Sequence, residues 1–204
     1  MNTPGREMMQ AETLQAVLRL AEACEYEAQH AQHVTRLALR LFDELTMLHD
    51  LGPRERFWLE CAGLLHDIGW VEGWKGHHKT SLRIILNTPM LPFGNKERLI
   101  IGSVARYHRK GLPNEKHDHF EALTPEEQDT ARALAALLRT ADGLDRSHQS
   151  RVLDLACKVR SKRILVRAAA VDDIQGELDA AHVKSDLMEQ VFKRRIVFES
   201  HSPD

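Results

Sequence analysis

The chain has 204 residues, of which 43% are hydrophobic and 28% are charged, and its formal net charge is −2. This length suits one domain with a sizeable core, and the near-neutral charge argues against general nucleic-acid binding. No apolar run approaches the roughly 18 residues that span a membrane, and the polar N-terminal stretch lacks a signal-peptide core. Cys24, Cys61 and Cys157 are scattered and odd in number, which argues against a disulfide framework. We therefore expect a cytoplasmic protein.

Hydrophobic periodicity divides the chain into a long helical part and a short mixed tail. We expect a flexible N-terminus at residues 1–12, a helical domain at 13–160 and a C-terminal appendage at 161–204. In the appendage, two segments alternate like strands, with helical spacing between them. Such an element cannot bury itself alone, so it should pack on the helical body. The predicted fold class is mainly α, a helical bundle with a small strand-helix-strand element.

The expected elements follow from local signals in chain order. Apolar residues recur at helical spacing from Val34 to Leu45. Thr124 before Pro125, with Glu127 three residues later, is a helix start. The expected helices cover residues 11–23, 34–45, 53–67, 80–86, 96–108, 125 to about 143, and 174–192, and the expected strands cover 163–170 and 194–200.

Charge is unevenly distributed along the chain. Residues 75–110 carry eight basic and one acidic side chain, and residues 139–167 carry eight basic and three acidic ones. The remaining segments are acidic. Solvated helix faces would explain single charges, but two basic blocks beside a possible metal site indicate an anionic ligand.

A His66-Asp67 pair stands at the end of an expected helix. Nothing continues the helix over these side chains, so both can turn toward one ion. A neutral imidazole with a carboxylate suits Zn²⁺, Mn²⁺, Fe or Co²⁺. The dipeptide alone is common, but His33 and Asp142 also lie beside apolar helix stripes. A buried Asp is costly unless it is paired or binds a metal.

The order His33, His66-Asp67 and Asp142 resembles the HD-domain superfamily of metal-dependent phosphohydrolases. That resemblance implies an all-helical core and a divalent metal bound by these four side chains. The expected cofactor is one or two divalent ions of Mn, Fe, Zn or Co, or Mg.

Further motifs are similar to the C-terminal HD domain of the exopolyphosphatase/guanosine pentaphosphatase family. They are GHHKTS at 76–81, ARYHRK at 105–110, LRTADGLDRSH at 138–148 and DLMEQVF at 186–192. The similarity covers nearly the whole chain. That family hydrolyses polyphosphate in an N-terminal, actin-like part that is not found in this sequence. We therefore expect a free-standing HD domain whose own site supplies any chemistry.

The resemblance also implies extra histidines between the HD pair and the last aspartate in proteins with two metals. His78 and His108 fall in that interval. They are either ligands of a second metal or phosphate contacts beside a single metal. His77 is an equally placed neighbour of His78, and the sequence does not decide which of the two points inward.

Basic side chains near the expected ligands could bind phosphate, because Arg forks match phosphate oxygens and Lys offers a point charge. We favour Lys79, Arg109 and Arg146, with surface salt bridges as the alternative. Asp145 follows the last expected ligand by three residues. It could orient a ligand histidine or act in proton transfer.

The expected function is metal-dependent hydrolysis of a phosphoester or phosphoanhydride in a nucleotide-like or polyphosphate-like substrate, by metal-activated water. His66, Asp67 and Asp145 would carry the catalysis. The sequence has no serine elbow and no P-loop, which disfavours those mechanisms. The alternative is a non-catalytic metal-containing module that binds a nucleotide, alarmone or polyphosphate. The expected partner is therefore a phosphorylated ligand, and a homo-oligomer is compatible with the sequence.

Overall fold

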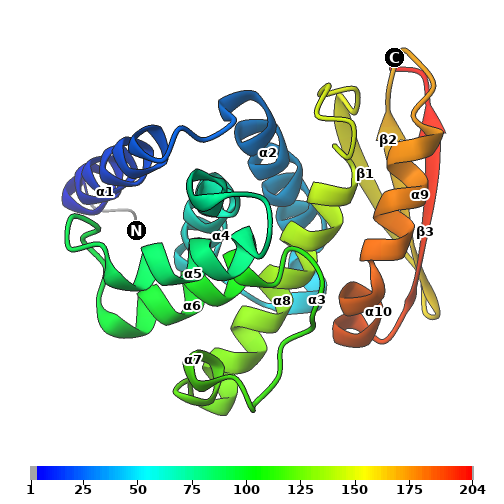
Figure 1. Ribbon diagram of the computed structural model, residues 1–204. Helices are drawn as coiled ribbons and strands as arrows, with labels where there is room; N and C mark the ends of the chain where they lie inside the picture. The colour runs from blue at the N-terminus through cyan, green and yellow to red at the C-terminus, as the bar shows by residue number, and fades with distance from the viewer. Residues whose placement is uncertain (1–3, 204) are drawn as a thin grey trace.

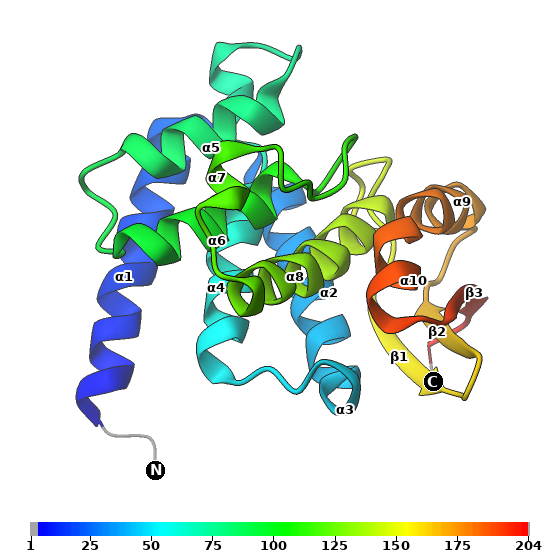
Figure 2. The same ribbon diagram turned by 90° about the horizontal axis from the view of Figure 1, so that it is seen from below.

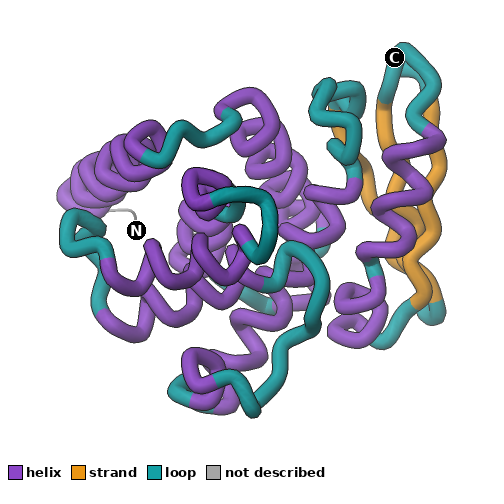
Figure 3. The backbone as a smooth tube through the Cα atoms, viewed as in Figure 1, coloured by secondary structure: helices purple, strands orange, loops and turns teal. Residues whose placement is uncertain are grey.

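A computed structural model describes residues 4–203 of the chain. A body of helices stands beside a C-terminal part in which helices cover a small sheet (Figure 1), and Figure 3 separates helices and strands by colour. The mainly helical fold class is confirmed. The helical body contains α1 (Pro4–Ala23), α2 (Ala28–Glu44), α3 (Thr46–His49), α4 (Pro53–Leu65), the 3₁₀ helix η1 (Ile68–Glu72), α5 (His77–Asn87), α6 (Asn95–Arg106), α7 (Asp118–Glu121) and α8 (Pro125–Gly143). The C-terminal part contains β1 (Asp154–Val159), β2 (Arg163–Ala169), α9 (Gln175–Lys184), α10 (Asp186–Phe192) and β3 (Arg195–His201).

Helix α8 runs through the centre of the molecule. The Thr124 hydroxyl accepts from the Glu127 N–H, and the Glu127 carboxylate accepts from the Thr124 N–H, which is the expected capping box. The C-terminal half of α8 is buried from Leu134 to Gly143. Helices α2, α6, α9 and α10 pack around it (Figure 2).

Helix α2 packs its predicted apolar stripe between α4 and α8, and Val34 and Leu41 are fully buried. Helix α4 crosses α2 closely because Gly63 has no side chain. A Cβ at Gly63 would lie 2.5 Å from the hydroxyl oxygen of Thr35. This contact holds the C-terminal end of α4, where the HD pair stands, against α2.

The first helix is longer than expected. It begins at Pro4, so residues 4–12, which we expected to be flexible, are helical. Residues 1–3 of that expected flexible stretch lie outside the described part. Val17 and Ala21 are fully buried, and α1 packs against α4.

The sheet has the order β1-β2-β3. Strands β2 and β3 are parallel and joined by α9 and α10, as the expected strand-helix-strand element requires. Strand β1 pairs antiparallel with β2, and the sequence analysis missed it because Leu155 is its one buried residue. Helix α2 supports β1: Arg40 donates to the Leu155 carbonyl at 2.8 Å, and the Glu44 carboxylate accepts from the Cys157 N–H at 2.7 Å. The sheet thus begins before residue 161, inside the range that we assigned to the helical domain.

The single helix expected at residues 174–192 is two helices, α9 and α10, which meet at Ser185. The Ser185 hydroxyl donates to the carbonyl oxygen of His182 at 2.8 Å. Local hydrogen bonds of this kind compete with the helical pattern. The break lets α9 and α10 follow different directions along α8 (Figure 2).

Candidate metal centre

His66 and Asp67 occupy the turn between α4 and η1. The His66 ring is fully buried, and its Nδ1 lies 2.6 Å from the carbonyl oxygen of Gly63. A carbonyl can only accept, so Nδ1 carries the proton and the lone pair of Nε2 faces the opposite way.

Helix α5 is held tightly against this turn. The Ser81 hydroxyl donates to the His66 carbonyl at 2.7 Å and accepts from the Gly69 N–H at 2.9 Å. A Cβ at Gly69 would lie 2.0 Å from the carbonyl oxygen of His77, so this close approach requires glycine. The contact brings the first residue of α5, His77, next to Asp67.

The first group of candidate ligands consists of His30, His66 and Asp142, which lie on α2, after α4 and on α8. The Nε2 atom of His30 lies 3.5 Å from Oδ1 of Asp142. Oδ2 of Asp67 lies 3.6 Å from Nε2 of His66 and 4.0 Å from Nε2 of His30. Four polar side chains from three helices therefore converge.

Asp145 lies behind the first group. Its Oδ2 is 2.8 Å from Nδ1 of His30, and its Oδ1 accepts from the Ser150 N–H at 2.8 Å. Asp145 is fully buried and does not line the adjoining cavity. It therefore fixes the His30 ring with Nε2 toward the group, as carboxylates behind metal-ligating histidines do.

The second group consists of Asp67, His77 and His108. Oδ1 of Asp67 lies 3.1 Å from Nε2 of His77 and 3.3 Å from Nε2 of His108. The Nδ1 atoms of these histidines face the carbonyl oxygens of Trp74 and Ala105, at 3.1 and 2.6 Å respectively. Both rings thus direct an Nε2 lone pair at a carboxylate oxygen. Asp67 joins the two groups, with one oxygen toward each.

Three buried atoms at the centre of this arrangement have no hydrogen-bond partner among the described residues: Nε2 of His30, Nε2 of His66 and Oδ1 of Asp67. Unpaired buried polar atoms are costly. Lone pairs of imidazole and carboxylate that face one another are also mutually repulsive. A divalent cation in each group would satisfy these atoms, so the residues present fit a metal site.

The pKa values of the candidate ligands reflect this arrangement. Burial opposes charge on His30, but the nearby carboxylates of Asp142 and Asp145 outweigh it and raise its pKa to about 9. Burial dominates at His108 and lowers its pKa to about 3. At Asp67, burial is outweighed by neighbouring histidines, above all His66, and the pKa lies below its usual range.

The structure does not bring His33 or His78 into either group. His33 is buried, and its Nδ1 lies 3.2 Å from the Arg36 guanidinium. Burial, followed by the charge of Arg106, lowers the pKa of His78 to about 4. His30 and His77 stand where we expected His33 and His78. His77 and His78 are successive helical residues that point about 100° apart, so only one of them can face a given centre. His30 and His33 lie one turn apart on α2, and His30 is the one that the helix crossing places at the centre.

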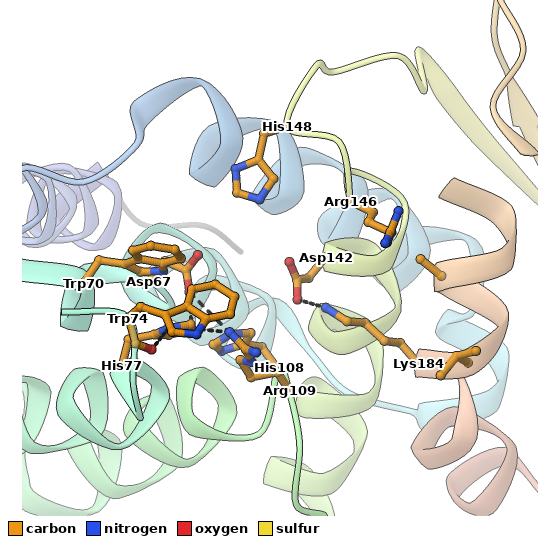
Figure 4. Close-up of a pocket in the computed structure, with 12 residues that line it drawn as sticks. Asp67, Trp70, Trp74, His77, His108, Arg109, Asp142, Arg146, His148 and Lys184 are labelled. Atoms are coloured by element: carbon orange, nitrogen blue, oxygen red, sulfur yellow. Dashed lines mark hydrogen bonds and ion pairs between the residues drawn. The ribbon is translucent and has the colours of Figure 1, made fainter. Parts of the chain in front are cut away.

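A cavity of about 630 Å³ opens onto both groups (Figure 4). Arg109 and Arg146, which we expected to bind phosphate, line it, and so does Lys184 from α9. Lys79 is exposed on α5 and is not among the lining residues.

Arg109 stands at the edge of the second group. Its NH1 lies 3.3 Å from Nε2 of His77, and its guanidinium lies 4.7 Å from the ring centroid of Trp74. Neither Arg109 nor Arg146 forms an ion pair with any carboxylate in the described part of the chain. Both cations are therefore free to meet an anion in the cavity.

Trp70 and Trp74 form an aromatic wall of the cavity (Figure 4). These two residues are 43% and 60% exposed, although large aromatic rings usually gain from burial. The Trp70 ring stacks on His77 with centroids 5.1 Å apart. The two indole rings are inclined at 67° to each other, so the wall consists of two separate aromatic rings directly beside the second group.

The sequence analysis missed several residues at this site. His30 continues the apolar stripe of α2 backward by one turn, since it precedes Val34 by four residues, and this spacing could have identified it. His148 lines the cavity and stacks on His30 with ring centroids 3.7 Å apart. His148 ends the motif at 138–148, but that motif gave it no role. No local pattern marked Trp70 or Lys184, because they reach the cavity from separate elements.

Fold and site together define a mainly helical, HD-like domain with buried His and Asp groups that could hold metal ions. The chain belongs to the family Ppx/GppA phosphatase, domain III, whose sequence profile matches residues 14–176. The resemblance indicated by the motifs is thereby confirmed.

A guanosine-5'-triphosphate,3'-diphosphate pyrophosphatase of Pseudoalteromonas atlantica is 29% identical to the chain over 132 residues. The match covers 64% of this chain but 26% of that relative, so the chain corresponds to a minor part of it. In the described part of the chain, no helix combines the length and the apolar character that crossing a bilayer would need.

Proposed function

We propose that the protein is a metal-dependent phosphohydrolase that cleaves a phosphoester or phosphoanhydride with water. The observation that carries this proposal is the pair of ligand groups joined by Asp67, with three unpartnered buried atoms at its centre. Arg109 and Arg146 line the cavity that leads there, which suits an anionic substrate.

His30, His66, Asp142 and one oxygen of Asp67 would hold one ion. The other oxygen of Asp67 would share a second ion with the histidines of the second group. Imidazole and carboxylate together suit Mn, Fe, Zn or Co better than Mg²⁺, which prefers oxygen ligands. When bound, such an ion supplies Lewis acidity, which acidifies water and offsets negative charge on the phosphoryl group.

The chain's own residues position the substrate and the ligands. Arg109 and Arg146 would donate to phosphoryl oxygens through charge-assisted hydrogen bonds. In the reaction, a water oxygen bonds to phosphorus while the bond to the leaving oxygen breaks. The proton lost by the water is balanced by one that the leaving oxygen takes up. Because Asp145 is buried behind His30, its position supports orienting that ring rather than transferring a proton.

The aromatic wall favours a nucleotide-like substrate over a polyphosphate chain. Stacking of a base on an aromatic side chain contributes about 1–3 kcal/mol, and Trp70 and Trp74 offer such a surface beside the metal centre. A polyphosphate chain has no planar group to place there. The Pseudoalteromonas relative is a guanosine-5'-triphosphate,3'-diphosphate pyrophosphatase, so guanosine 5'-triphosphate 3'-diphosphate should be included among the substrates tested.

The alternative function is binding without turnover. The chain matches a minor part of its relative, which is what an accessory domain would do. Such a domain could bind a phosphorylated ligand in its cavity without hydrolysing it. Hydrolysis and binding without turnover would both use the metal and the cavity, but only hydrolysis would release phosphate.

The test begins with protein loaded with Mn²⁺, Fe²⁺, Co²⁺ or Zn²⁺, whose metal content is measured by elemental analysis. Phosphate release is then followed with nucleoside polyphosphates, cyclic nucleotides, pyrophosphate and polyphosphate. We expect release that a chelator stops and fresh metal restores. Binding of these compounds without release would favour the sensing alternative. Protein that holds no metal after loading would contradict the proposal.

A variant pair tests the phosphate contacts. Arg109→Ala should weaken binding of a phosphorylated ligand by roughly 10- to 150-fold, the cost of one charge-assisted hydrogen bond, and leave metal content unchanged. Lys79→Ala is the matched control, because Lys79 lies in the same basic block but outside the cavity. Calorimetric titration with pyrophosphate measures both. Equal losses in the two variants would mean that the effect is one of overall charge.

A further inference from the structure

One residue of the C-terminal part reaches the metal centre. Lys184, the last residue of α9, extends into the cavity, and its ammonium contacts Oδ2 of Asp142 (Figure 4). Its side chain is 28% exposed, so it is accessible from the cavity. Lys184 lies beyond residues 14–176, the part of the chain that the family profile matches.

The packing of α9 on α8 determines this position. A Cβ at Gly143 would lie 2.6 Å from the Cα of Ala181, so the two backbones touch next to Asp142. Arg139 of α8 forms an ion pair at 2.8 Å with Asp186, the first residue of α10. These contacts fix the C-terminal end of α9 over the metal centre, and Lys184 with it.

The two oxygens of Asp142 face different partners. Oδ1 lies 3.5 Å from Nε2 of His30 in the first group, whereas Oδ2 faces the Lys184 ammonium at the cavity. An ammonium has three N–H donors, and the Lys184 ammonium has Asp142 as its one hydrogen-bond acceptor among the described residues. Donors therefore remain for a second acceptor in the cavity.

Three cations surround the cavity from three different elements. Arg109 follows α6, Arg146 follows α8 and Lys184 ends α9. The carboxylates that line the same cavity are those of Asp67 and Asp142, which the proposed function assigns to metal ions. If metal ions neutralise those two carboxylates, the positive charge of the three cations remains uncompensated in the cavity. An anionic ligand would compensate it.

We propose that Lys184 binds the phosphoryl group of the substrate, so that the C-terminal strand-helix-strand element completes the active site. The inference rests on the proposed function, since it requires a phosphate beside the metal centre. Lys184 would donate to Asp142 and to a phosphoryl oxygen at the same time. The helical body would then supply the metal ligands, and the appendage would supply one of the substrate contacts.

The experiment measures binding of inorganic phosphate, a probe that cannot be hydrolysed, to the full chain loaded with Mn²⁺. Titration calorimetry compares the natural protein with Lys184→Met and Lys184→Gln. The glutamine variant keeps a donor for Asp142 and loses the charge. Lys162→Met is the matched control, because Lys162 is an exposed lysine of the same C-terminal part, between β1 and β2.

Both Lys184 variants should bind phosphate roughly 10- to 150-fold more weakly, while Lys162→Met binds it normally. Their manganese content and unfolding temperature should match those of the natural protein. Unchanged phosphate affinity in both variants would overturn the inference. Joint loss of manganese, phosphate binding and thermal stability in both would also overturn it, because Lys184 would then only hold α9 in place. If the natural protein hydrolyses substrate while the variants bind phosphate normally, the proposed function stands and this inference falls.

Discussion

The two ligand groups use the same residue types in different electrostatic surroundings. In the first group, His30 lies 3.5 Å from Asp142 and 2.8 Å from Asp145, and its pKa is raised to about 9. In the second group, His108 has Asp67, at 3.3 Å, as its one carboxylate within ion-pair distance among the described residues, and its pKa is lowered to about 3. Negative charge therefore dominates the first group, and burial dominates the second.

This difference predicts unequal affinity for cations. The first group combines a carboxylate of its own with an oriented histidine on the long helices α2 and α8. The second depends on a carboxylate that it shares, and His77 and His108 stand at the ends of shorter elements that face the cavity. We expect the first group to keep its ion firmly and the second to exchange its ion more readily.

The largest effect is expected from Asp67→Ala. Asp67 belongs to the second group and directs its other oxygen at the first, so both groups should lose their metal. Elemental analysis after loading should show the natural protein with metal and the variant without. Asp50→Asn is a suitable control, because Asp50 is an exposed carboxylate with φ of 52°, a conformation that Asn also tolerates. Full metal content in Asp67→Ala would show that Asp67 does not join the groups.

A comparison of His30→Ala with His77→Ala separates the two groups. We expect His30→Ala to remove the tightly held ion and His77→Ala to remove only the readily exchanged one. Titration of metal-free protein with Mn²⁺ should show one remaining site in each variant, the stronger one in His77→Ala. His33→Ala and His78→Ala are the neighbouring controls and should keep both sites. The reverse order of affinities would contradict the expectation that the first group binds its ion more tightly than the second.

A smaller effect should follow from Asp145→Asn. The side chain stays the same size but loses the charge that orients and polarises His30. Loss of such a supporting carboxylate typically costs about 10- to 100-fold in metal affinity. Metal titration should show this loss at the tight site, with the weaker site unaffected. Equal weakening of both sites would mean that Asp145 acts through the stability of the fold instead.

A change of pH should have the smallest effect of these tests, and it should affect the metal affinities of the two groups differently. Below pH 9 the ion-free protein carries a proton on His30, which has a pKa of about 9, and an entering ion must displace it. Affinity of the first group should therefore fall about tenfold for each pH unit below that value. His108, with a pKa of about 3, binds no proton near neutrality and adds no such dependence to the second group. Metal titrations at several pH values would measure the two slopes, and equal slopes would contradict the assignment.

Local signals in the sequence predicted much of the helical body. The capping box at Thr124, the stripe on α2 and the alternation of strands β2 and β3 each depend on neighbours in sequence, and the structure confirms them. Strand β1 was not predicted because it has one buried residue, which gives no alternation of apolar and polar side chains. The break at Ser185 escaped because a single serine hydroxyl within a helical pattern is a weak signal.

The sequence by itself determined which side chains are available at the candidate site: an HD pair after a helix, a later aspartate before a helix end, histidines between them, and two basic blocks that follow the HD pair. Tertiary structure alone decided which histidines meet. His30 and His33, and likewise His77 and His78, are all buried and lie within one turn of each other, so composition and periodicity treat them nearly alike. The close contacts at Gly63, Gly69 and Gly143 set how the helices cross. A rotation of less than one turn then selects the facing side chain, because helical residues are spaced about 100° apart.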